Sequence, residues 1–171
     1  MTTQTLKQYL DARDVPYVVL THSPAYTAQE VAQSAHIRGH LLAKSVVLSI
    51  DNQLALAVIP ASQHIDLVDL KRSIRAFKLD LASEDDFKDL FPGCELGALP
   101  PFGNLYGMQV YIAECLAKEA EITFCAGSHS ELIQMDYRDF ARLVEPVVIT
   151  HGAVPNRPTP PRMKEHLGVY P

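Results

Sequence analysis

The sequence predicts a mixed α+β domain in which a curled β-sheet is flanked by helices. Amphipathic helical segments alternate with strand-like runs early in the chain, whereas strand-like runs cluster late. These runs are short and separated by irregular loops, which favours a barrel-like sheet curled around a cavity over an open doubly wound sheet. The length of 171 residues suits one domain with a sizeable core.

Local signals in the first half of the chain place both helices and strands. Apolar residues at helical spacing predict helices over residues 3–14, 27–36 and 64–77. Runs of β-branched and apolar residues predict strands over residues 17–22, 43–50 and 53–60. Thr27 followed by Glu30 is a capping-box signature for the second helix, which we expect to stop near Gly39. Asp51-Asn52 between two strands predicts a hairpin turn.

In the second half, a short helix is expected over residues 83–91, ended by Pro92-Gly93, and a last helix over 137–145. Strands are expected over residues 109–114, 120–127 and 131–137. From residue 146 onward, prolines punctuate a segment with little periodicity. We therefore divide the chain into a domain, residues 1–145, and a proline-rich tail, residues 146–171, that is extended, packed along the body or partly disordered.

Charge is spread unevenly along the chain. The formal net charge is −5, which argues against broad, non-specific binding of nucleic acid. Residues 36–78 nevertheless hold six Lys/Arg against three Asp, a local charge of +3 that leaves −8 for the rest. A basic face on an acidic protein suits a small anionic ligand or one end of a nucleic acid, and a merely solvated basic surface is the alternative.

Composition also bears on the compartment. No apolar run approaches the length of a membrane span, and the N-terminus lacks the basic start and apolar run of a signal peptide. We therefore expect a cytoplasmic protein with no membrane partner. Cys94, Cys115 and Cys125 are odd in number and lack CxxC spacing, so we expect them to be reduced and mostly buried.

Common catalytic signatures are absent from the sequence. Neither GxGxxG nor GxxxxGK[ST] occurs. His36 and His40 are four residues apart without a nearby carboxylate, so we interpret them as helix-end histidines and expect no metal site. Ser128-His129 is a weak candidate for a serine nucleophile, because adjacent residues rarely place hydroxyl and imidazole in contact and "AGSHSE" is not a GxSxG elbow. A Cys-His pair involving Cys125 is a further, weaker alternative.

Three features remain distinctive. Lys44 opens the otherwise apolar run "AKSVVLSI", and the alternative to a functional role is an edge lysine that extends to solvent. The loop "LGALPPFG", residues 96–103, combines stiff prolines with permissive glycines, and a rigid connection is its simplest alternative role. The run "FCAGSHSELIQM" ends a strand at Gly127 and turns through small polar residues.

In their order and spacing these features resemble the YbaK / prolyl-tRNA synthetase-associated editing domain family, over about residues 5–145. The resemblance includes "THSPAYTAQEVA", the strand lysine in "AKSVVL", a GxxxP loop from Gly97 to Pro101, and the strand pattern F-x-A-G. It implies a trans-acting aminoacyl-tRNA deacylase that needs no cofactor. The sequence departs from the family pattern in placing Pro100 beside Pro101 and in its proline-rich tail.

The resemblance also implies roles for individual residues. It implies water attack oriented by the free ribose hydroxyl of the substrate, with oxyanion stabilisation by backbone N–H groups. The expected catalytic residues are Lys44, Gly97 and Pro101. The expected substrate-binding residues are His22, Tyr26, Gly103, Gly127, Ser128 and His129.

The expected partner is the tRNA acceptor end carrying a mischarged small amino acid such as alanine, serine, cysteine or threonine, and an aminoacyl-tRNA synthetase is a second candidate partner. Two alternatives stay open. One is a non-catalytic module of the same fold that binds an aminoacyl or nucleotide end as a sensor. The other is a hydrolase or transferase that acts on a different small ester through Cys125 or His129.

Overall fold

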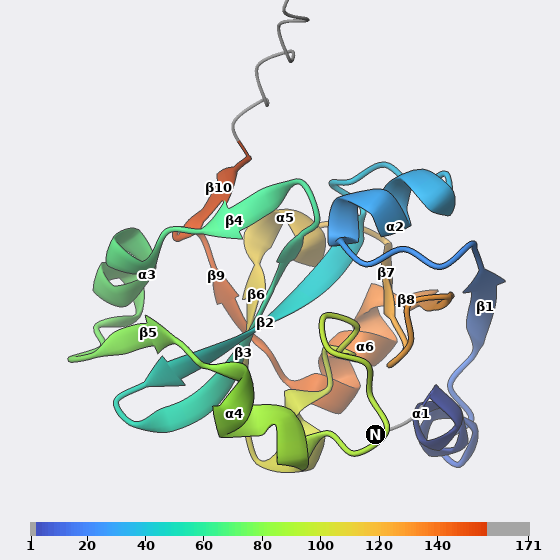
Figure 1. Ribbon diagram of the computed structural model, residues 1–171, viewed down its shortest axis with the longest axis horizontal. Coiled ribbons are helices and arrows are strands. Elements are labelled where there is room, and N and C mark those ends of the chain that lie inside the picture. Colours follow the sequence, from blue (N-terminus) through green and yellow to red (C-terminus); the bar gives the residue numbers. More distant parts are fainter. Residues whose placement is uncertain (1–2, 157–171) are drawn as a thin grey trace, which may run out of the picture.

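The computed structural model describes residues 3–156, and its central feature is one eight-stranded mixed sheet (Figure 1). The strand order is β1-β8-β7-β2-β3-β6-β9, and β5 pairs with β2 beside this path. Their bounds are β1 (Tyr17–Thr21), β2 (Leu42–Ile50), β3 (Gln53–Pro60), β5 (Leu79–Leu81), β6 (Gln109–Ala113), β7 (Glu121–Cys125), β8 (Glu131–Asp136) and β9 (Val147–Ile149). The end strands β1 and β9 do not pair with each other, so the sheet stays open.

Helices cover both faces of the sheet, which confirms the predicted mixed fold. They are α1 (Thr3–Asp11), α2 (Ala28–Ser34), α3 (Leu67–Ile74), α4 (Glu84–Phe87), α5 (Glu114–Ala117), α6 (Tyr137–Val144) and the 3₁₀ turns η1 (Lys88–Leu90) and η2 (Gly103–Tyr106). One face packs against α1, α6 and the segment 87–108. The other face packs against α2 at one end and α3 at the other.

The main core lies on the first of these faces. Alternate residues of β2, Ala43 and Val47, point into it, as the two-residue period of a strand requires. Phe102 meets Phe124 and Phe140 edge to face, with ring centroids 5.6 and 5.5 Å apart. Such pairs contribute about 0.5–1.5 kcal/mol each beyond the area that they bury.

Two local predictions about turns and caps are confirmed. Asp51 and Asn52 have positive φ values of 50° and 66°, as a tight hairpin turn between β2 and β3 requires. Thr27 caps α2, and Glu30 completes the capping box.

The helix bounds differ from the sequence prediction for reasons of capping. α2 ends at Ser34, before Gly39, because His36 adopts a φ of 56° and the Ile37 N–H donates to the carbonyl of Ala32 at 2.8 Å. α3 starts only at Leu67, because the Asp66 carboxylate caps it by accepting the Asp69 N–H at 2.9 Å.

The residues after 145 take part in the fold as far as the structure describes them. β9 runs parallel to β6, and β10 (Ala153–Pro155) pairs with β4 (Gln63–Ile65). These strands were not predicted from the sequence, and neither were β5 and α5, because elements of three or four residues carry too little periodicity. Residues 157–171 lie outside the described part, so the division at residue 145 stays a prediction. Among residues 3–156 no helix is both long and apolar enough to cross a membrane.

Candidate active site

The sheet splits beside Lys44. Along one edge of β2, residues 42–43 pair with β7, whereas residues 48–50 pair with β5. Between these two partners, residues 44–46 face no strand of the described chain on that edge, while the other edge pairs continuously with β3. A split of this kind opens a central strand to loops and ligands without loss of the rest of the ladder.

Lys44 places a cation at this split. Its side chain lies on the same face of β2 as Leu42 and Leu48, two residues before and four residues after it. Leu42 packs in the cluster beneath α2, and Leu48 packs beneath α3, so Lys44 lies between the two helices. It is half-buried and forms no ion pair within residues 3–156, and burial lowers the pKa of its ammonium group. A desolvated lysine without a carboxylate partner suits an anionic or hydroxyl-bearing ligand.

The loop that contains Gly97 is tied to the end of β7. The Glu95 N–H donates to the Gly127 carbonyl at 2.9 Å, and the Gly127 N–H donates to the Ala98 carbonyl at 3.0 Å. Ala98 packs with Leu42 on the α2 side of the sheet. Pro100 and Pro101 are both buried, so the loop is fixed by packing as well as by its prolines.

Two backbone amides at this junction have no hydrogen-bond acceptor. Neither the Gly97 N–H nor the Ser128 N–H donates to any atom of residues 3–156. Gly97 has a φ of +84°, a conformation that glycine adopts readily and other residues adopt at a cost. Unused amides on a loop held in place by other bonds have the character of an oxyanion-binding site.

The turn after β7 brings further predicted residues to Gly97. The His129 ring lies against Tyr26, with ring centroids 5.2 Å apart. The His129 carbonyl accepts the Ala25 N–H at 3.2 Å, and the His22 N–H donates to the Ser130 carbonyl at 3.0 Å. A Cβ atom built on Gly97 would lie 3.6 Å from Cε1 of His129. The turn and the loop therefore form one cluster.

The capping box of α2 positions Tyr26 within this cluster. One carboxylate oxygen of Glu30 accepts the backbone N–H groups of Tyr26 at 3.2 Å and Thr27 at 3.1 Å. These hydrogen bonds, led by that of Thr27, lower the pKa of Glu30. A helix-start signal in the sequence therefore fixes the backbone that presents an aromatic ring to His129.

Glu95 belongs to the site but was not anticipated. Its carboxylate accepts the backbone N–H of His129, and its own N–H bonds to Gly127. It also lines a cavity of about 490 Å³ together with Ser128 and with Lys7 and Glu131, whose charged groups are 3.2 Å apart. A lone glutamate outside any motif carries no signal in the sequence, so only its contacts reveal its position.

Gly103 lies in the main core and not in the cluster. A Cβ atom on Gly103 would lie 2.8 Å from Leu56 Cδ1 and 3.0 Å from Val110 Cγ2. The structure thus corrects the expectation that Gly103 lets a ligand approach the backbone, because apolar core side chains occupy the space beside it. Pro101 is buried next to Phe102 of the main core, where it can stiffen the loop.

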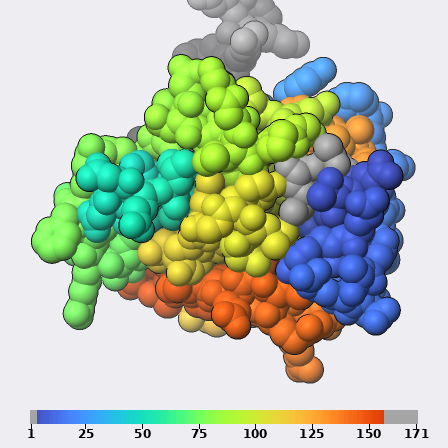
Figure 2. Space-filling view, turned by 90° about the horizontal axis from the view of Figure 1, so that it is seen from below, coloured from blue at the N-terminus to red at the C-terminus, as the bar shows by residue number. Residues whose placement is uncertain are grey.

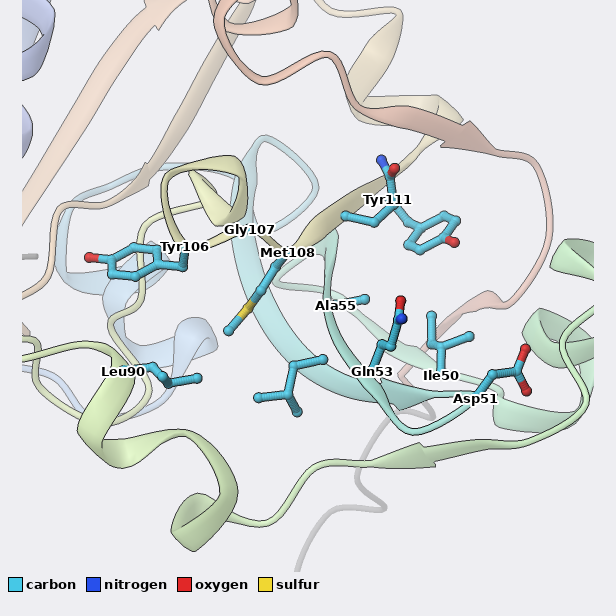
Figure 3. Close-up of a pocket in the computed structure, with 11 residues that line it drawn as sticks. Ile50, Asp51, Gln53, Ala55, Leu90, Tyr106, Gly107, Met108 and Tyr111 are labelled. Carbon is cyan, nitrogen blue, oxygen red and sulfur yellow. The ribbon is translucent and has the colours of Figure 1, made fainter.

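A cavity of about 760 Å³ lies on a different part of the molecule and contains none of the predicted site residues. It is bounded by the β2–β3 hairpin, Leu90 and the segment 106–111. Figure 2 shows the hairpin, in teal, beside this segment, in yellow. In Figure 3 the Asp51 carboxylate lies on one side and Tyr106 on the other. No Lys or Arg lines this cavity, which makes it a poor site for a phosphate.

The alternative catalytic groups receive little support from the geometry. His36 and His40 are exposed and lie beyond the end of α2, so they do not share a helical face. In the part of the chain from residue 3 to 156, no three His, Cys, Asp or Glu residues gather in a way that could hold a metal ion. Burial raises the pKa of Cys125 to about 11, which keeps its thiol protonated at neutral pH.

Comparison with known proteins identifies the family of this chain. Residues 22–143 match the family model of the aminoacyl-tRNA editing domain. The chain is 30% identical over 158 residues to the multifunctional Ser/Thr-tRNA deacylase ProXp-y of Escherichia coli K12, covering 87% of this chain and 92% of that protein. It is 27% identical to the prolyl-tRNA editing protein ProX of Acetoanaerobium sticklandii, covering 80% and 86%.

A solved structure described as a candidate trans-editing enzyme for prolyl tRNA synthetase superposes with a TM-score of 0.72 at 21% identity. The superposition covers 88% of this chain and 96% of that one, and at this identity it supports the fold. The family match spans well over half of the chain and includes Lys44, Gly97 and His129. The chain therefore belongs to the aminoacyl-tRNA editing domain family.

Proposed function

We propose that this protein is a trans-acting deacylase that hydrolyses the ester between a wrongly attached small amino acid and the terminal adenosine of a tRNA. The observation that carries the proposal is the split in the sheet, where β7 leaves β2 beside Lys44 and continues into the turn from Gly127 to His129. The loop that contains Gly97 is hydrogen-bonded to this turn. The relatives named as a Ser/Thr-tRNA deacylase and a prolyl-tRNA editing protein support the reaction class.

An aminoacyl ester is already activated, so the enzyme must place a water molecule and stabilise the oxyanion. The unused N–H groups of Gly97 and Ser128 supply donors fixed in advance. The free ribose hydroxyl of the substrate orients the water, so no catalytic triad is required. Lys44 binds a phosphate or ribose oxygen of the terminal adenosine as a compact charge.

Polar groups near the turn support a preference for particular amino acids. His22 Nε2 and Ser128 Oγ are buried and have no hydrogen-bond partner among the described residues. A substrate hydroxyl would satisfy such atoms, and a site built around a hydroxyl strongly rejects an analogue that lacks one. Serine and threonine esters are therefore the first candidates, and alanine and cysteine are the next.

The partner is accordingly the acceptor end of a mischarged tRNA. An aminoacyl-tRNA synthetase that releases the wrong product is a second partner. The cytoplasm, where charged tRNA is made and used, is the expected compartment.

Hydrolysis without added metal is the first test. We expect the purified protein to release the amino acid from at least one of four tRNAs mischarged with serine, threonine, alanine or cysteine, in the presence of a chelator. The reason is that the proposed chemistry uses backbone donors and one lysine. Release of labelled amino acid measures the rate, and a correctly charged tRNA is the control. Activity that disappears in chelator and returns with zinc or magnesium would contradict this mechanism.

Replacing Cys125 with alanine tests the thiol alternative. Most of the deacylase activity should remain, because a buried thiol with a raised pKa is a poor nucleophile. We expect the free energy of unfolding to fall by only about 1 kcal/mol, the cost of deleting one small buried group. Cys115→Ala, at an exposed position, is the matched control. A drop of several orders of magnitude in a folded Cys125→Ala protein would favour a cysteine nucleophile instead.

A further inference from the structure

A basic surface with an exposed aromatic ring lies on α3 and the turn that follows it. We call it the α3 surface, and it consists of Val68, Lys71, Arg72, Arg75 and Phe77. The Phe77 side chain is 91% exposed and Val68 is 69% exposed, which is unusual for such residues. Together with Ala76, these residues line a shallow hollow of about 350 Å³.

The positive charges of this surface are free to meet an external partner. Within residues 3–156, no ion pair involves Lys71, Arg72 or Arg75. The acidic side chains of this helix are occupied elsewhere, because Asp66 caps α3 and Asp69 accepts the Gly152 N–H at 2.9 Å. The surface therefore carries a net positive charge on a protein whose total charge is −5.

The α3 surface lies on the Lys44 side of the sheet. Leu70 of α3 packs with Leu48 of β2, and Leu48 shares a strand face with Lys44. Leu48 lies four positions after Lys44 along the strand, and this corresponds to a distance of about 13 Å. A nucleic-acid strand carries one phosphate per about 3.4 Å of helix axis. A strand that ends at Lys44 can thus reach α3 within a few nucleotides.

Two other parts of the molecule are less favourable to RNA. The first turn of α4 and the loop beside Gly97 carry carboxylates: Glu84, Asp85, Asp86 and Glu95. A phosphate backbone is repelled from these groups and attracted to α3. In Figure 1, α3 lies at the left of the sheet and α4 lies below it. The difference in charge between these two places therefore directs a bound RNA strand towards α3.

We propose that the α3 surface binds the sugar–phosphate backbone of the RNA strand that leads to the aminoacylated end, with Phe77 stacking on a base or ribose. Lys71, Arg72 and Arg75 contact phosphates, and the flat ring provides a sequence-tolerant platform. The inference rests on the proposed function for the identity of the RNA, although RNA binding by this surface can be measured without any turnover.

The first experiment compares two triple variants with the same change in charge. Lys71→Gln/Arg72→Gln/Arg75→Gln removes the α3 charges, and Lys88→Gln/Lys118→Gln/Arg138→Gln removes three exposed charges on other elements. Filter binding of uncharged tRNA gives the Kd at several salt concentrations. The α3 variant should bind about 10–100-fold more weakly, and its log–log salt slope should be shallower by about 2–3, because each neutralised phosphate contributes about 0.7–0.9. The control variant should behave as wild type.

The second experiment tests the aromatic ring. Phe77→Ala should weaken tRNA binding by about 10-fold, whereas Phe77→Tyr should retain wild-type affinity, because a stacked ring is worth about 5- to 150-fold per base. Phe77→Leu keeps an apolar side chain without a flat ring, and it should resemble Phe77→Ala.

A short substrate separates this inference from the proposed function. On an aminoacylated adenosine, which cannot reach α3, the α3 triple variant should match wild type, while its kcat/KM on full-length aminoacyl-tRNA should fall about 10–100-fold. If wild type cleaves neither ester but the α3 variant still loses tRNA affinity, the proposed function fails and the RNA surface stands. Equal tRNA affinity and an equal salt slope for both triple variants would overturn the proposal that the α3 surface binds RNA. Binding of an acidic protein to this surface would not rescue that proposal.

Discussion

Replacing Gly97 with alanine is expected to lower the rate of aminoacyl-tRNA hydrolysis by about 10²–10³-fold, the typical effect of losing one oxyanion donor. The unused N–H of Gly97 is the proposed donor, and it is aimed by a φ of +84° that alanine disfavours. An added methyl group would also sit 3.6 Å from His129 Cε1 and 3.9 Å from the Tyr26 carbonyl oxygen, within the space proposed for the ester. Single-turnover deacylation at saturating enzyme measures the effect on the chemical step.

The same substitution carries a cost in stability that needs its own control. A left-handed backbone costs roughly 1–2 kcal/mol for an L-residue, so the free energy of unfolding should fall by about that amount. Gly107 also has a positive φ, +70°, and a Cβ atom there meets nothing within 4 Å. Gly107→Ala should therefore lose similar stability while retaining activity. If Gly97→Ala, once folded, turned over normally, Gly97 would be a turn residue only.

Replacing Lys44 with alanine is expected to reduce deacylation by about 10–100-fold. A hydrogen bond to a charged group contributes roughly 1.5–3 kcal/mol, and each ~1.4 kcal/mol corresponds to a factor of ten. Lys44→Arg should restore only part of the rate, because a planar guanidinium does not replace a compact ammonium in a tight site. Lys118→Ala, at an exposed lysine on the surface, is the control. Wild-type rates of Lys44→Ala on every mischarged tRNA that wild type hydrolyses would remove Lys44 from the mechanism.

The stability of Lys44 variants gives an independent readout. Burial lowers the pKa of Lys44 in the folded state below 10.5, so the unfolded chain holds this proton more tightly. The charged lysine therefore disfavours folding at neutral pH, and Lys44→Met should be at least as stable as wild type. As pH rises from the lowered pKa towards 10.5, the free energy of unfolding of wild type increases because Lys44 loses its charge in the folded state first. The difference in this free energy between Lys44→Met and wild type should therefore shrink. Urea unfolding at several pH values tests this, and a marked loss of stability in Lys44→Met would contradict it.

Much of the fold could be predicted because its signals are local. Thr27 and Glu30 interact across three residues, and Asp51-Asn52 lie within one turn, so their neighbours in the chain determine their structure. The alternation of apolar residues likewise predicts the long strands β2 and β3, since each strand needs one face for a core. Membership of the editing-domain family also followed from motifs in order along the chain.

The arrangement of the site depends on contacts between distant segments. The chain shows that Lys44 is a charged residue in an apolar run, but the opening beside it exists only because β7 and β5 pair with different parts of β2. Gly97 and Gly103 look alike in the loop, yet one faces His129 and the other faces Leu56. Local residue patterns determine turns, caps and strands. Strand pairing and side-chain packing determine which of those residues come into contact, because the energies of pairing and packing arise between segments that are far apart in the sequence.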